Sequence, residues 1–211
     1  MKSEDAWTSA AAAYNEFERC WNDPNATRFE LPAIGVNDIL AKRYRMSPPT
    51  NLTRSMIWDM ECKKALDPST YVPYVISQAG LLARRKLSDG CDHFIRWSTQ
   101  KAWLSERQGQ VIESIFVDHS SQRIIFLGIA KAIAEDGRTI SAVDYQPLVH
   151  VEHAAGGPEH NPHNLWRIVF LTERKDERYT HPFDQMALAG FLPGYLEIYI
   201  QKDLNIELAR R

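Results

Sequence analysis

Residues 110–130, QVIESIFVDHSSQRIIFLGIA, decide the fold class of this chain. Two apolar runs, 110–117 and 122–134, flank the polar tetrapeptide DHSS, and both are rich in Ile, Val and Phe, which favour strands. A connection this short has no room for a crossover helix, so the two strands must be antiparallel neighbours. The stretch therefore predicts a β-hairpin.

The same pattern continues on both sides of this hairpin. Strand-like runs separated by short polar turns occupy residues 81–87, 91–104, 138–152 and 164–173. Apolar and polar residues also alternate through 53–62, which predicts a half-buried strand there. Together with the hairpin, these runs predict an antiparallel sheet of about seven strands.

Helical patterns occur towards both ends of the chain. In residues 5–21 an apolar stripe recurs at steps of three and four residues, and a second short helix is expected at 36–45. Residues 67–80 predict two short helices or one kinked helix, because Pro73 cannot lie inside an unbroken helix. Residues 181–211 carry an i,i+4 apolar stripe that favours a C-terminal helix, and a strand over 195–201 is the alternative because YLEIYIQ alternates with a period of two.

The SPP tripeptide at 47–49 marks the expected boundary between two parts of the chain. Helical periodicity precedes it and alternating periodicity follows it. We therefore expect an N-terminal helical extension at 1–50 and one ligand-binding domain at 51–211. The fold class is α+β.

Composition excludes several classes of function. The 211 residues carry a formal net charge of −2, so no basic field attracts nucleic acid or an anionic membrane. Three cysteines are too few and too scattered for a disulfide framework, and no apolar leader or membrane-length segment occurs. These features predict a cytoplasmic protein. No Walker loop or GxGxxG motif follows a strand, and we expect no cofactor.

The element order from residue 53 resembles the START/Bet v 1-like, or helix-grip, superfamily, which includes polyketide cyclase-like proteins and lipid carriers. The resemblance implies a curved antiparallel sheet around the C-terminal helix, with an apolar cavity between them. Residues 12–29, AAYNEFERCWNDPNATRF, are instead similar to the first helix of SnoaL-like (nuclear-transport-factor-2-like) cone folds. That fold, which also hosts cyclases and dehydratases, is the second choice.

Four candidate catalytic residues lie in HVEHAAGGPEHNPHNLW, residues 150–166. On an extended strand His150 and Glu152 point to one face and His153 to the other. The Gly- and Pro-containing loop after them can fold back and bring His163 to the same region. Three interpretations stay open: general acid–base groups, a metal site of His and carboxylate ligands, or a polar hairpin loop.

Two further polar residues and a set of aromatic side chains complete the candidate site. His93 shares a strand face with Trp97, so it is a candidate for a polar group within an apolar cavity. Asp144 is a candidate catalytic carboxylate. Arg96, in a polar series with Ser98 and Gln100, is expected on the outer surface. The candidate ligand-binding residues are large and apolar or aromatic: Trp58, Met60, Trp97, Trp103, Tyr145 and Trp166.

These observations lead to three functional hypotheses. The first is an enzyme that catalyses cofactor-independent cyclisation, isomerisation or dehydration of a polyketide- or terpenoid-like molecule in an apolar cavity. The second is a non-catalytic carrier of a lipid or sterol. The third is a metal-dependent hydrolase or lyase that uses the histidines of 150–163. The expected partner is a hydrophobic small molecule, and a homodimer is left open.

Overall fold

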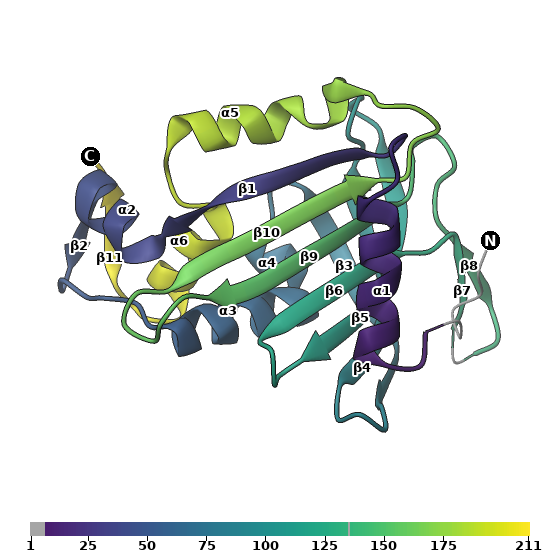
Figure 1. The fold of residues 1–211 in the computed structure, drawn as a ribbon, viewed down its shortest axis with the longest axis horizontal. Helices are drawn as coiled ribbons and strands as arrows, with labels where there is room; N and C mark the ends of the chain where they lie inside the picture. Colours follow the sequence, from purple (N-terminus) through teal and green to yellow (C-terminus); the bar gives the residue numbers. More distant parts are fainter. Residues whose placement is uncertain (1–6, 135) are drawn as a thin grey trace.

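The computed structural model describes residues 7–134 and 136–211. Its centre is a seven-stranded antiparallel sheet (Figure 1). In spatial order the strands are β1 (Thr27–Gly35), β10 (His163–Phe170), β9 (Val149–Gly156), β6 (Arg123–Gly128), β5 (Gln108–Asp118), β4 (Asp92–Lys101) and β3 (Ile76–Lys86). The predicted fold class, α+β with a seven-stranded antiparallel sheet, is confirmed.

Helices cover both faces of this sheet. Helix α1 (Ala10–Trp21) crosses strands β5, β6 and β9 on one face, which we call the α1 face (Figure 1). Helix α3 (Arg54–Leu66) packs on β9 and β10, α4 (Pro68–Tyr71) packs on β3, and α6 (Gly194–Lys202) packs on both helices. We call the face beneath α3 the cavity face. Helix α5 (His181–Ala189) runs beside β1.

The hairpin at 110–130 forms as predicted. Strands β5 and β6 pair from Glu113 opposite Gly128 to Asp118 opposite Arg123. Beyond it the chain adds a small two-stranded sheet of β7 (Lys131–Ile133) and β8 (Thr139–Ser141) before returning as β9. The later histidine-rich segment, residues 150–166, forms nearly all of β9, a turn, and the start of β10.

The α1 face is closed by a compact apolar layer. Phe17 and Ala13 of α1 are fully buried against Ile112 and Phe116 of β5. Ser9 begins the helix by accepting the Ala12 amide hydrogen bond, as an N-cap serine does. Because α1 belongs to the same hydrophobic core as the sheet, it holds this face closed.

The strand predicted at 53–62 is wrong, because these residues belong to α3. Thr53 caps the helix by accepting a hydrogen bond from the Met56 amide. The buried positions recur at helical spacing, and two of them are charged: Ile57, Met60, Glu61, Lys64 and Ala65. Asp67 then caps α4 with Pro68 at its start, as expected, but β3 begins at Ile76, within the segment predicted to be helical.

The missing seventh strand comes from the N-terminal segment. Residues 27–35, for which the sequence predicts no strand, form β1 and pair with β10. The helices predicted on either side are found, as α1 and as α2 (Val36–Arg43). Residues 5 and 6 of the first predicted helix lie outside the described residues. The main sheet therefore contains residues from both sides of the boundary predicted at residue 50.

The C-terminal segment is not one continuous helix. Pro193 separates α5 from α6, and α6 ends at Lys202. Asn205 then adopts a left-handed conformation with a φ of 52°, which turns the chain. Residues Glu207–Arg210 form β11, which pairs with β2 (Tyr44–Ser47). A 3-10 turn, η1 (Glu177–Tyr179), precedes α5. None of the described helices is long and apolar enough to span a membrane.

Candidate functional site

A cavity of about 210 Å³ lies between the cavity face and the helices packed on it. Most of its surface is apolar. The sheet contributes Val111, Phe126, Val151, Trp166 and Ile168, the chain after α4 contributes Val72 and Tyr74, and α5 contributes Phe183 and Met186. An engineered apolar cavity of roughly 150 Å³ binds benzene, so this volume accepts a small aromatic or terpenoid-sized molecule.

A buried polar cluster reaches the cavity from α3 and β9. The Lys64 ammonium lies 2.6 Å from Glu61 Oε2 and 3.0 Å from His153 Nδ1. Asn164 donates a 2.7 Å hydrogen bond to the other oxygen of Glu61, and the Tyr195 hydroxyl donates a 2.7 Å hydrogen bond to Asn164. We call these five residues the floor cluster. Lys64, His153 and Tyr195 line the cavity, with Glu61 behind them.

Burial and charge determine how the floor cluster holds its protons. Burial lowers the pKa of Lys64 to about 8, and the Glu61 carboxylate only partly opposes this effect. Burial lowers the pKa of His153, and the positive charge of Lys64 lowers it further. Burial alone would raise the pKa of Glu61, but Lys64 and His153 lower it below its ordinary value. At neutral pH His153 is therefore neutral and Glu61 ionised.

The histidine ring is held by contacts on several sides. It stacks on Trp166 with the ring centres 5.8 Å apart, and it meets the edges of Phe126 and Tyr195. When the Lys64 ammonium donates to Nδ1, a neutral His153 carries its proton on Nε2; Glu61 Oε2 lies 3.4 Å from the same Nδ1. These contacts fix the ring orientation.

A second buried ion pair lies on the same face of the sheet. Arg96 of β4 meets Glu113 of β5 at 2.5 Å, and it also donates a 2.6 Å hydrogen bond to the Ala65 carbonyl near the end of α3. A cation is favourable at a helix C-terminus because the last carbonyls carry partial negative charge. The expectation that Arg96 lies on the outer surface is wrong, since only 4% of the residue is exposed and it lines the cavity.

Three of the residues predicted from the sequence line the cavity. His153 does so from β9, Trp166 from β10 and Trp103 from the turn after β4. The ring of Trp103 contacts Phe183 of α5, with centres 5.5 Å apart. These three are the predicted residues that the structure brings to one place.

Four predicted residues point to the α1 face instead. His93 makes a 2.8 Å hydrogen bond with Ser114 and lies against Phe116, and the neighbouring Trp97 packs over Gly80. Glu152 accepts a hydrogen bond from Arg167 and lies 3.0 Å from Arg123. His150 lies beneath α1. The prediction that His150 and Glu152 share a face while His153 takes the other follows from strand alternation and agrees with the structure.

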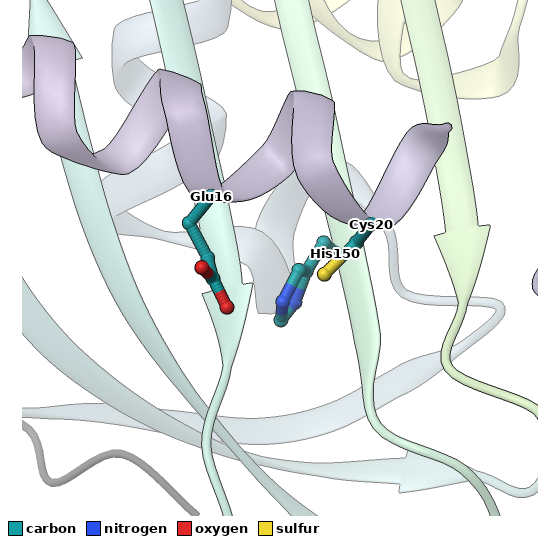
Figure 2. Close-up of side chains that lie close together, drawn as sticks. All are labelled: Glu16, Cys20 and His150. Carbon is teal, nitrogen blue, oxygen red and sulfur yellow. The ribbon is translucent and has the colours of Figure 1, made fainter. Parts of the chain in front are cut away.

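His150 meets two α1 side chains, as Figure 2 shows. Glu16, Cys20 and His150 place potential metal-ligand atoms within 4.8 Å of one another, the only such group among the described residues. However, Arg19 binds Glu16 at 2.9 Å and reaches the Cys20 sulfur at 3.1 Å. His150 Nδ1 accepts the Gly128 amide hydrogen bond, so the other nitrogen carries the ring proton. This geometry favours a polar contact between helix and sheet over a metal site.

The remaining predicted residues lie away from the cavity. Asp144 is exposed, and the Tyr145 hydroxyl donates to the Gln108 carbonyl at 2.9 Å. His163 begins β10 at the far end of the sheet, half-buried. Trp58 and Met60 lie on α3, where Met60 is buried in the core and Trp58 meets His119.

Two solved structures are similar to this chain over most of its length. The Zhui aromatase/cyclase from Streptomyces sp. R1128 aligns with a TM-score of 0.51 and 9% identity, over 83% of this chain and 95% of that chain. Ara h 8.0201 aligns with a TM-score of 0.50 and 9% identity, over 85% of this chain and 99% of that chain. The chain has the helix-grip fold. At this level of identity the similarity shows the fold alone. No family model matches the sequence, and no curated protein matches it.

The helix-grip prediction is confirmed, but sequence reasoning missed most of the polar residues at its cavity. Glu61 and Lys64 were placed on or beside a strand that does not exist. Their spacing of three residues, beside Ile57, Met60 and Ala65, is the available signal of a buried helical face. Two of these five buried residues are charged, so a search for apolar residues at helical spacing does not detect the buried face.

Proposed function

We propose that this protein is an enzyme that cyclises, isomerises or dehydrates a hydrophobic small molecule, polyketide- or terpenoid-like in chemistry. The observation that carries the proposal is the floor cluster, which places a buried Lys64–His153 contact against a largely apolar cavity. Ionisable groups with perturbed pKa values in a cleft are the usual mark of acid–base chemistry. The aromatase/cyclase similarity agrees with this proposal.

His153 has the features of the acid–base group. Its neutral ring presents a proton on Nε2, which can polarise or protonate a carbonyl oxygen of the bound molecule. Loss of that proton to the substrate is balanced by the adjacent Lys64 ammonium, 3.0 Å from Nδ1. The apolar walls exclude water, which strengthens these interactions and suppresses hydrolysis of reactive intermediates.

A non-catalytic carrier is the second candidate, and one observation favours it. Most polar groups at the cavity already bond to one another, as in the Arg96–Glu113 and Lys64–Glu61 pairs. A carrier needs only the apolar walls and predicts binding without conversion. The metal-dependent hydrolase has less support, because His150 and His153 lie on opposite faces of β9.

Ligand binding and turnover test these proposals in sequence. Native mass spectrometry of the purified protein identifies any co-purified metabolite. The neutral dye N-phenyl-1-naphthylamine should bind at one site, and Val151→Phe should abolish this binding because the added ring fills the cavity. Ile133→Phe is the matched control, since Ile133 is 58% exposed on β7 and outside the cavity. Wild-type dye binding near zero would remove the cavity proposal.

Turnover of the identified metabolite then separates enzyme from carrier. We expect His153→Ala to lower the rate about a hundredfold or more, as loss of a general acid or base does. His150→Gln, on the α1 face, should leave turnover within a few-fold of wild type. Tight binding with no conversion by the wild-type protein would identify a carrier.

A further inference from the structure

The amine of Lys64 is buried at the cavity, and the proposed acid–base reaction uses it only as a proton donor to His153. Lys64 lines the cavity, yet only 4% of the residue is exposed. Its ammonium lies 3.7 Å above the centre of the Tyr195 ring, between the Glu61 carboxylate and the His153 ring. The neighbouring Lys63 differs, since its side chain is 42% exposed, against 5% for that of Lys64, and it bridges Asp59 and Asp203.

We propose that Lys64 captures a carbonyl group of the bound molecule as an imine. The inference rests on the proposed function and adds a substrate class, a hydrophobic aldehyde or ketone. A buried amine beside a proton acceptor is the arrangement that lysine nucleophiles require, because only the neutral amine attacks a carbonyl carbon.

The neighbours of Lys64 can complete this step with protons in balance. The Lys64 ammonium passes one proton to His153 Nδ1, to which it is already hydrogen-bonded. The neutral nitrogen attacks the carbonyl carbon, and the carbinolamine forms after its nitrogen loses a second proton to the carbonyl oxygen. His153 returns its proton to the hydroxyl, which leaves as water while the C=N bond forms. No oxidant or reductant is needed, and water reverses the step.

The electrostatics agree with this geometry. The pKa of Lys64, lowered by burial to about 8, leaves a large neutral fraction at pH 8. An ordinary lysine with a pKa near 10.4 is less than about 1% neutral at that pH. The pKa of Lys63 is shifted in the opposite direction, because hydrogen bonds to Asp59 and Asp203 raise it. Lys63 therefore has an even smaller neutral fraction than an ordinary lysine.

Reductive trapping tests the inference on the full-length protein. The protein is incubated at pH 8 with limiting 2-naphthaldehyde and cyanoborohydride, which reduces the imine to a secondary amine. The stable adduct adds the mass of the aldehyde less one oxygen. We expect peptide mapping to find Lys64 modified at least about tenfold faster than any other lysine, given its larger neutral fraction. The rate should rise through pH 8, well below the range of surface lysines.

Two variants separate a nucleophile from a structural lysine. Lys64→Arg keeps a buried cation but should lose the fast phase of labelling, whereas Lys63→Arg should keep it. Displacement of N-phenyl-1-naphthylamine by the aldehyde reports binding independently in each protein. Displacement of the dye without preferential labelling of Lys64 would overturn the inference and leave the proposed function standing. Failure of the wild-type protein to bind either compound would overturn both.

Discussion

Two histidines three positions apart on β9 have opposite environments. His153 faces the cavity and bonds to Lys64, whereas His150 is buried under α1. The groups facing His150 are Glu16, Arg19 and Cys20 from α1 and the Gly128 amide from β6. Burial lowers the pKa of His150 to about 4, with Glu16 opposing and Arg19 assisting this shift. A buried neutral histidine makes stability depend on pH.

We predict that the protein loses stability as the pH falls below about 6.5. The unfolded state binds a proton at His150 from its ordinary pKa downward, but the folded state binds it only near pH 4. The free energy of unfolding should therefore fall by about 2 kcal/mol between pH 7 and 5 from this residue alone. Urea unfolding at both pH values measures the loss.

His150→Gln is the control for this pH dependence. Glutamine can accept a hydrogen bond but does not titrate, so the loss between pH 7 and 5 should shrink by about the same 2 kcal/mol. The other acid-sensitive groups of the floor cluster, Glu61 and His153, are present in both proteins and cancel. Equal losses in both would show that His150 is not the group responsible.

Helix α3 shows why an element can carry a misleading pattern. Met56, Trp58 and Met60 alternate with other residues as on a strand, yet the buried face repeats with helical spacing. Glu61 and Lys64 belong to that face because each finds partners across the core. A buried pair of this kind is stable only when it is fully hydrogen-bonded. A pattern based on apolar residues alone does not detect such a buried charged pair.

The N-cap of α3 gives a direct test of the helix. Thr53→Ala removes the acceptor for the Met56 amide, which lies 3.1 Å away, and should cost about 1 kcal/mol of unfolding free energy. Thr139→Ala, at an exposed position on β8, should change stability by less than about 0.5 kcal/mol. Urea titration of both variants makes the comparison. Equal small effects would contradict the capping role.

Over the whole molecule, the N-terminal segment belongs to the same sheet and core as the rest. Phe17 is fully buried on the α1 face, and β1 pairs with β10 at the edge of the sheet. Removal of both exposes an apolar sheet face and an unpaired edge, which favours aggregation. The division at residue 50 stays a prediction, and truncation tests it.

We predict that deletion of residues 1–46 abolishes cooperative unfolding. Phe17→Ala, a milder loss in the same layer, should cost about 3–5 kcal/mol and keep a cooperative transition. Circular dichroism during urea unfolding follows both proteins. A cooperative transition in the truncated protein would instead establish residues 47–211 as an autonomous folding unit.

Local patterns alone specified most of the sheet. The runs between 81 and 128 are joined by short turns, which favour antiparallel pairing, and so are the strands β9 and β10. The chain between these two groups, residues 129–148, instead forms the separate sheet of β7 and β8. The hairpin at 110–130 is the clearest case, because strand propensity and connection length agree. Strand alternation also separated His150 from His153 correctly. These features depend on near neighbours in the chain, so they can be inferred without tertiary contacts.

Which face of the sheet is the cavity was decided only by tertiary packing. Alternation groups Arg96 with Ser98 and Gln100, and Trp97 with His93, but it assigns neither set to the cavity. The packing of α1 on one face and α3 on the other decides which face lines the cavity. Helix α3 also brings Lys64 to His153, 89 residues away in the sequence. A buried charge is tolerated only where distant partners satisfy it, so its place cannot be inferred from its neighbours in sequence.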